Sequence, residues 1–299
     1  NTIGQQNCAF GYGSLQNNTT SIDNSAFGFY ALKNNTTNQN SAFGYKALTA
    51  NTIGTQNVAV GFGSLQSNTT GTNNTAVGYQ SLVNQTTGRG NSALGFRSLQ
   101  NNIIGVANSA FGYYALQNNT TNSNSAFGYK ALNANTIGTN NTAVGLSSLL
   151  SNTTGNSNTA VGYLSLYFNT IGNNNTAVGS QALNSNTSGN CNTAIGKSTL
   201  LNNTTGYCNT GLGFAALFCN TTGINNTGLG AGALRYNTTG GSNTAVGIGS
   251  MQQNTTGIRN TAVGMQSLSS NTGGFCNVAL GYRALLSNTI GNYNTGLGA

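Results

Sequence analysis

The sequence predicts an all-β fold, a parallel β-solenoid (β-roll) of about 18 coils with a 17-residue repeat. Words of the type NTAVG recur along all 299 residues, and their spacing is 17 residues in most copies. The chain is rich in Gly, Asn and Thr, which favour turns and strands over helices. Seventeen extended residues measure roughly 55 Å, enough for two short strands and two turns in one coil. A helical hairpin repeat needs roughly 30 residues or more.

The repeated unit reads N-[TS]-[AG]-[VFL]-G-x-x-[AS]-L-x-x-N-T-[TI]-G-x-x, and we number its glycine as position 0. The spacing falls to 16 residues before Gly44 and before Gly128. Both short copies read NTTN-x-N, at residues 35–40 and 119–124, where other copies read NTTG-x-x-N. The deletion therefore falls in a turn, and we expect the strands to keep their register. The array is expected to form one continuous domain over residues 1–299, as a segment of a longer chain.

The first strand of each coil is predicted at positions −3 to +1, and a second strand near +3 to +9. Large apolar residues at position −1, such as Phe10 and Val60, are expected to point inward because side chains alternate between the two faces of a strand. Position −3 carries Cys8, Val58 and Val278 among Ser and Thr, so it is expected to be partly buried. Ala or Gly at −2 and Gly at 0 then form a small opposite face, open to another layer, another chain or the turn itself.

Asparagine occupies position −4 in every copy and position +7 in all complete copies except the one with Gln85. Stacked Asn amides can bond along a solenoid axis and satisfy turn backbone, so we predict two Asn ladders. The alternative is ligand binding or N-glycosylation, because the chain contains many N-x-[ST] motifs. The candidate glycosylation sites are Asn18, Asn35, Asn68, Asn73, Asn84, Asn119, Asn140, Asn152, Asn174, Asn186, Asn203, Asn220, Asn225, Asn237 and Asn254.

Aromatic residues fill position +1 in eight successive coils. This stripe consists of Tyr12, Phe29, Tyr45, Phe62, Tyr79, Phe96, Tyr113 and Tyr129. Ser180 and Lys197 occupy the same position further along, so it is not a uniform core column. The stripe is interpreted either as core or edge packing or as an exposed lateral interface or sugar platform.

Two of the five cysteines, Cys191 and Cys208, share position −5 one coil apart. Adjacent coils would place their Cα atoms about 5 Å apart, which is within disulfide reach. We predict this pair as the intrachain bridge; the alternative is five free thiols.

The composition argues against several function classes. Nine Lys and Arg, one acidic residue and no His leave little for acid–base catalysis, so no enzyme is expected. Metal binding through His or paired carboxylates is not expected either, and no cofactor is expected apart from covalent N-glycans. Nine dispersed cations make no phosphate-binding stripe, so nucleic acid is not an expected partner. No apolar run reaches the roughly 18 residues of a membrane span.

The words NSAFG, NTAVG and NTAIG resemble the short head repeats of trimeric autotransporter adhesins. They also resemble the NTAVG-x-x-[AS]-L arrays of bacterial surface proteins and phage tail-fibre proteins. This resemblance covers the whole chain and implies an extracellular parallel β-roll, often trimeric, that serves as a stalk or an adhesive head.

These observations together predict a structural, glycan-coated fibre or shaft, extracellular or on the cell surface, that self-associates laterally or end to end. The first alternative is an adhesin or tail-fibre module that recognises glycans with the aromatic stripe. The second is an ice-binding solenoid, because Thr recurs at positions +8 and +9.

Overall fold

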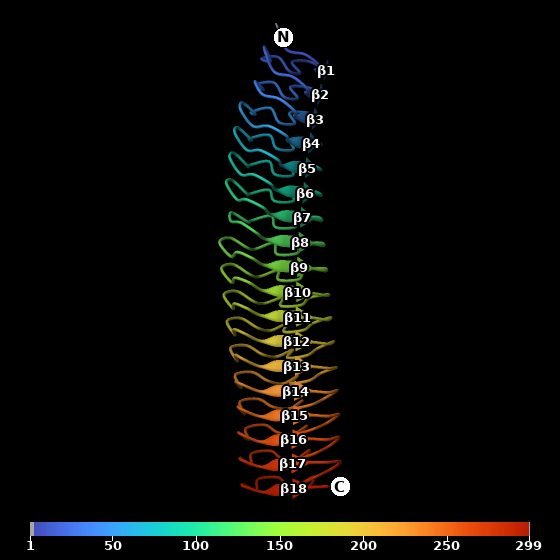
Figure 1. The fold of residues 1–299 in the computed structure, drawn as a ribbon, viewed down its shortest axis with the longest axis vertical. Helices are drawn as coiled ribbons and strands as arrows, with labels where there is room; N and C mark the ends of the chain where they lie inside the picture. The colour runs from blue at the N-terminus through green and yellow to red at the C-terminus, as the bar shows by residue number, and fades with distance from the viewer. Residues whose placement is uncertain (1–2, 299) are drawn as a thin grey trace. The chain divides into compact units, whose positions relative to one another are not determined.

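A computed structural model describes residues 3–298, and it confirms an all-β parallel solenoid with a 17-residue repeat. The chain divides into two compact units, residues 1–147 and 148–299. In each unit the strands lie in chain order, and every strand pairs in parallel with the next one (Figure 1). The expectation of one continuous domain over 1–299 stays a prediction.

Each described coil contains one three-residue strand at positions −3 to −1. The strands of the first unit are β1 Cys8–Phe10, β2 Ser25–Phe27, β3 Ser41–Phe43, β4 Val58–Val60, β5 Thr75–Val77, β6 Ser92–Leu94, β7 Ser109–Phe111, β8 Ser125–Phe127 and β9 Thr142–Val144. Those of the second unit are β10 Thr159–Val161, β11 Thr176–Val178, β12 Thr193–Ile195, β13 Thr210–Leu212, β14 Thr227–Leu229, β15 Thr244–Val246, β16 Thr261–Val263, β17 Val278–Leu280 and β18 Thr295–Leu297.

The second strand predicted near positions +3 to +9 is wrong, because the backbone there turns instead of extending. Between β4 and β5, Leu65 at position +4 has φ 48°. In the next coil Gln80 and Leu82, at +2 and +4, have φ 52° and 49°. Left-handed residues at +2 and +4 interrupt the alternation that a strand requires. The coil therefore has one short strand, and turns make up the rest.

The predicted side-chain directions in the strand are also wrong. Position −2 faces the interior: Ala59 and Ala76 have no exposed surface. Position −1 faces outward, with Leu94 47% exposed and Phe111 36% exposed. Position −3 also lies on the outer face, where Val58 is 38% exposed, but most of its Ser and Thr residues are half-buried, as the expectation of partial burial had it. The inward and outward faces are therefore the reverse of those expected.

The core of each coil is narrow, which explains the reversal. Leu at position +4 is fully buried in coil after coil, as Leu82 and Leu183 illustrate, and burying one such side chain contributes roughly 1.5–3 kcal/mol. Small residues at −2 and +3, such as Ala177 and Ala182, occupy the remaining apolar space. A Phe at −1 would not fit beside these residues, so the bulky side chains point to solvent.

The small strip at position 0 accepts the backbone of the next coil. A Cβ added at Gly78 would lie 2.4 Å from the Gly95 carbonyl oxygen, and one at Gly162 would lie 2.7 Å from the Gly179 carbonyl carbon. Both glycines also have φ near +130°. At position 0 this strip is therefore covered by the backbone of the neighbouring coil.

The two Asn ladders are confirmed. At position +7, Asn186 Nδ2 donates to Asn169 Oδ1 (2.8 Å) in the preceding coil and to the Gly189 carbonyl (3.0 Å) in its own turn. At position −4, the backbone N–H and Nδ2 of Asn57 both donate to Asn40 Oδ1 (3.0 and 3.2 Å). These buried amides thus satisfy the turn and link neighbouring coils, as buried polar groups require.

The two short coils keep the strand register, as predicted. Ser25 pairs with Ser41, and Ser109 pairs with Ser125, across the 16-residue intervals. In the first short coil, Thr37 stands where other coils have glycine, and its Oγ1 donates to the Gly54 carbonyl at 2.6 Å. The missing residue is therefore absorbed in the turn.

Among the described residues, the +7 ladder is interrupted before the short coil at residues 119–124, where the buried Asn102 Oδ1 has no hydrogen-bond partner, and also at Gln85. The Gln85 Nε2 donates to the Gly88 carbonyl (3.0 Å), and Asn68 Oδ1 in the preceding coil is buried with no hydrogen-bond partner. We expect Gln85→Asn to restore the missing bond and to raise the free energy of unfolding by about 1 kcal/mol, the net value of one such bond. Chemical denaturation measures the change. The control Gln66→Asn shortens an amide side chain outside the ladder. An equal rise in the free energy of unfolding for this control would show that the restored ladder bond is not the cause.

Candidate interaction surface

The aromatic stripe predicted at position +1 lies on the surface of the first unit as a continuous stack of rings. We call it the aromatic ladder: Tyr12, Phe29, Tyr45, Phe62, Tyr79, Phe96, Tyr113 and Tyr129. Successive ring centroids are 4.8–5.5 Å apart, and the ring planes differ by 6–16°. Seven rings are exposed and Phe96 is half-buried, so the ladder is a surface feature and not core.

The coil spacing explains the geometry of the ladder. Parallel strands lie about 4.8 Å apart, and side chains at one position of successive coils must therefore stack or splay. Within the ladder, neighbouring rings cover each other's faces, and the ring edges are left towards solvent. A sugar packs its C–H groups on a ring face, so this geometry favours lateral packing over a sugar platform.

A second apolar row runs along the first unit at position −1. It consists of Phe10, Phe27, Phe43, Val60, Val77, Leu94, Phe111, Phe127 and Val144, all exposed or half-buried. The rings of Phe27 and Phe43 stack at 4.9 Å, and those of Phe111 and Phe127 at 5.0 Å. We call this row and the aromatic ladder together the apolar stripe. Contiguous exposed apolar surface of this kind is typical of interaction sites.

Cations at position +2 lie over rings of the ladder. The Lys46 ammonium is 5.2 Å from the Tyr45 centroid, the Arg97 guanidinium is 5.2 Å from the Phe96 centroid, and the Lys130 ammonium is 5.3 Å from the Tyr129 centroid. These are cation–π distances. Three of the five cations of the first unit therefore border the ladder.

Two tyrosines of the first unit, Tyr113 and Tyr30, have a raised pKa. The hydrogen bond to Tyr114 raises the pKa of Tyr113, and desolvation raises it further. Desolvation, followed by the neighbouring Tyr12, raises the pKa of Tyr30. These two phenols are therefore uncharged at neutral pH.

Sequence reasoning missed the row at position −1, because it placed these side chains inside. A signal for the outward direction is present: position −1 varies among Phe, Val, Leu and Ile, whereas position −2 is restricted to Ala and Gly. A tightly packed interior tolerates little change in volume. The position with constant small residues is therefore the inner one.

In the second unit the +1 column is interrupted. Ser180, Lys197 and Ala231 stand in this column among larger residues such as Tyr163 and Phe214. No continuous stack of rings forms in residues 148–298, because small or charged side chains separate the aromatic ones. The aromatic ladder is thus a property of the first unit.

Most of the glycosylation candidates are buried, and this corrects the prediction for ten of them. They are the +7 residues Asn18, Asn35, Asn68, Asn119, Asn152, Asn186, Asn203, Asn220, Asn237 and Asn254, each at most 1% exposed. A glycan on Nδ2 would place sugar inside the coil and remove a donor of the +7 ladder. A folded coil cannot accommodate it.

The remaining five candidates are exposed: Asn73, Asn84, Asn140, Asn174 and Asn225. Asn84 lies at position +6, where its Nδ2 donates to Asn101 Oδ1 at 3.1 Å. The other four lie at position −5 and have φ of 56–59°. Their modification stays a prediction.

The cysteine pair lies where the sequence places it, but the bridge is not formed. Cys191 and Cys208 are exposed free thiols at position −5 of adjacent coils, and the Cys208 N–H donates to the Asn190 carbonyl at 3.0 Å. Closure of a Cys191–Cys208 bridge by oxidation stays a prediction. Burial raises the pKa of the Cys219 thiol, which disfavours the reactive thiolate there.

Within residues 3–298, no group of three or more His, Cys, Asp or Glu side chains is placed to hold a metal ion. The same residues include no helix long and apolar enough to cross a bilayer.

The fold and the surface define a class: a parallel β-solenoid with internal Asn ladders and an exposed apolar stripe. No protein-family model matches the chain, and no curated protein sequence matches it.

Proposed function

We propose that this chain is a structural protein, a stretch of an extracellular shaft that associates laterally with copies of itself through the apolar stripe. The observation that carries the proposal is the division of roles between inside and outside. Inside, the two Asn ladders hydrogen-bond each coil to the next, and the Leu side chains at position +4 form a buried column. Outside, the first unit keeps its largest side chains exposed in two rows.

Stability in such an array accumulates through neighbouring coils. Backbone bonds such as Leu65 N to Ser81 O (3.0 Å) and Gly78 N to Val60 O (2.8 Å) run from coil to coil. Because each coil interacts only with its neighbours, the array can be lengthened without changing its cross-section. This property suits a shaft.

A second copy of the chain is the partner that the stripe fits best. Stacked ring edges and the aliphatic side chains of position −1 present a repetitive apolar surface, and a second stripe has the same repeat along the axis. The five exposed Asn candidates, Asn73, Asn84, Asn140, Asn174 and Asn225, would carry the proposed glycan coat. The proposed location is extracellular or at the cell surface.

The proposal predicts that charge in the ladder weakens association. We expect the double variant Phe62→Lys, Phe96→Lys to raise the dissociation constant of self-association at least about tenfold, because two apolar contacts worth roughly 1.5–3 kcal/mol each are lost. Lysine is compatible with the column, since Lys197 occupies it in another coil. Analytical ultracentrifugation and electron microscopy of the full chain measure the effect.

The matched control is Thr70→Lys, Thr87→Lys, which adds the same charge at exposed positions outside the stripe. This control is expected to associate as the wild type does. Equal weakening by both double variants would show a general charge effect, and unchanged association of the ladder variant would overturn the proposed interface.

A further inference from the structure

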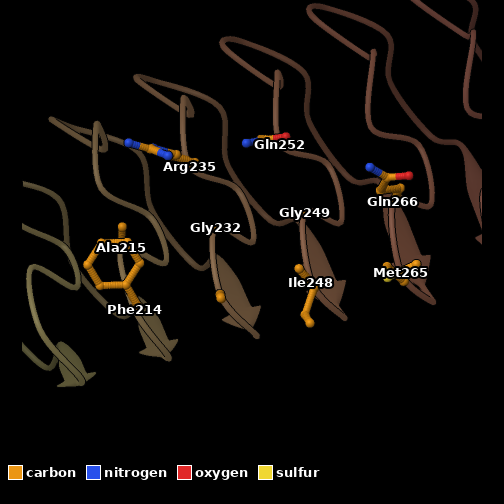
Figure 2. A pocket seen from close by; sticks show the side chains of 10 residues that line it. Phe214, Ala215, Gly232, Arg235, Ile248, Gly249, Gln252, Met265 and Gln266 are labelled. Atoms are coloured by element: carbon orange, nitrogen blue, oxygen red, sulfur yellow. The ribbon is translucent and has the colours of Figure 1, made fainter.

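The second unit contains a cavity of about 230 Å³ where its outer columns carry small residues. Ala231 interrupts the +1 column, and Gly232 and Gly249 interrupt the +2 column. The cavity has two chemically different walls. Figure 2 shows Arg235, Gln252 and Gln266 in one row, and Phe214, Ile248 and Met265 in a second row, with the glycines between them.

Arg235 supplies an unpaired positive charge to this cavity. Its guanidinium carbon lies 5.8 Å from the Phe218 centroid and 5.5 Å from the Tyr236 centroid, so two rings flank the group. Its Nε is buried and has no hydrogen-bond acceptor among the described residues. The only acidic side chain of the whole chain, Asp23, belongs to the first unit. A carboxylate is the planar anion that matches a guanidinium fork best.

Phe214 differs from the rings of the aromatic ladder. In the ladder, each ring from Tyr12 to Tyr113 is covered on one face by the ring of the next coil, whereas the coil after Phe214 presents Ala231. Phe214 is 56% exposed, and its side chain lines the cavity. This ring can therefore offer a face to the C–H groups of a ligand.

Two glutamine amides complete the polar wall. Gln266 Oε1 accepts a hydrogen bond from Arg283 Nε at 2.8 Å, which leaves the Gln266 Nε2 group as a donor. Gln252 contributes both an amide donor and an amide acceptor. One wall can thus bind a carboxylate and hydroxyl groups, while the opposite wall packs against C–H groups.

We propose that this cavity binds a carboxylated sugar ring, a uronic acid unit of an acidic glycan. A sugar ring has the required combination of hydroxyl edges and a C–H face, and the carboxylate accounts for Arg235. The cavity is smaller than the about 300–1,000 Å³ typical of drug-sized ligands, so it accommodates a single unit. This inference does not depend on the proposed shaft function, because it uses other residues in the other unit.

Saturation-transfer NMR and calorimetry on the full chain test the proposal with three probes. Methyl β-glucuronide carries both the hydroxyls and the carboxylate, methyl β-glucoside lacks the carboxylate, and phenylacetate lacks the hydroxyls. We expect the glucuronide to bind at least about tenfold more tightly than either of the others, since charge-assisted bonds are about twice as strong as neutral ones and unpaired site groups penalise the wrong ligand.

Three variants locate the binding. Arg235→Gln removes the charge and places glutamine where the next coil has Gln252. Ala231→Tyr restores a ring to the +1 column and covers the Phe214 face. The control Arg259→Gln removes an exposed charge outside the cavity. We expect the first two variants to weaken glucuronide binding at least about tenfold and the control to leave it unchanged.

A further variant fills the cavity at a position where the backbone of another coil already accepts a side chain, so that loss of binding cannot be due to unfolding. Gly232 has φ +66°, close to φ 52° of Gln80 at the same position of another coil, and an added Cβ would lie 3.9 Å from Gln252 Nε2. Gly232→Gln is therefore expected to fold, as circular dichroism would show, and to block the cavity. The proposal is overturned if glucuronide does not bind, if phenylacetate binds equally well, or if glucuronide binding survives in Arg235→Gln, Ala231→Tyr and Gly232→Gln.

Discussion

The variant Gly78→Ala is expected to lower the free energy of unfolding by about 4 kcal/mol. Gly78 has φ +131°, and an added Cβ would lie 2.4 Å from the Gly95 carbonyl oxygen of the next coil. The unfavourable backbone angle costs roughly 1–3 kcal/mol, and forcing apart two packed backbones costs roughly a further 1–3 kcal/mol. Chemical denaturation followed by circular dichroism measures the loss.

Gly90→Asn is the matched control for this prediction. Gly90 also has a positive φ, +65°, but no atom lies within 4 Å of its added Cβ. Asn73 holds a similar angle, φ 57°, at the same position of the preceding coil. The control is expected to change the stability by no more than about 0.5 kcal/mol. If both variants lost the same stability, the close approach of coils at position 0 would not be the cause.

The variant Asn237→Asp is expected to lower the stability by about 3–5 kcal/mol at pH 7. Asn237 is fully buried, and its Nδ2 donates to Asn220 Oδ1 (2.7 Å) and to the Gly240 carbonyl (3.0 Å). A carboxylate there would face two acceptors and carry an uncompensated buried charge, which costs this much. Thermal and denaturant unfolding measure the loss.

The stability that Asn237→Asp loses is expected to be smaller at low pH, because the folded protein favours one protonation state of the new carboxyl group. The folded protein favours the neutral carboxyl, which can donate one hydrogen bond, so the pKa of the new group is raised above the unfolded value of about 3.9. The stability of Asn237→Asp relative to the wild type is therefore greatest below the unfolded pKa, and it is lost as the pH rises through the folded pKa. Asp23 is the only native acidic side chain, so the wild type contributes little competing titration of this kind.

Asn225→Asp is the control for charge alone. Asn225 is exposed at position −5, the position that Asp23 occupies naturally in another coil, and both have positive φ. The stability of the Asn225→Asp variant is expected to stay within about 0.5 kcal/mol of the wild type at every pH. A pH profile that matched the one of Asn237→Asp would contradict a special role for the buried ladder.

The candidate surface was only partly predictable. The aromatic ladder could be found as a column of rings, because residues that recur at the coil period must lie above one another. Whether Phe62 and Tyr79 stack face to face, and so hide their faces, follows only from the coil spacing and the local backbone. The cavity at Arg235 depends on Ala231, Gly232 and Gly249 together, three small residues that carry no recognisable motif.

The sequence by itself determined the repeat length, the parallel coils, the Leu column, the two Asn ladders and the register across the short copies. These features depend only on which residues recur and at what interval. The tertiary structure decided which side chains are inside. Alternation along a strand defines two faces but does not say which is inner; the choice follows from the narrow space that Leu82, Asn68 and their equivalents leave in a coil. That space admits Ala76 and excludes Phe111, so the small residues are buried and the large ones form the exposed stripe.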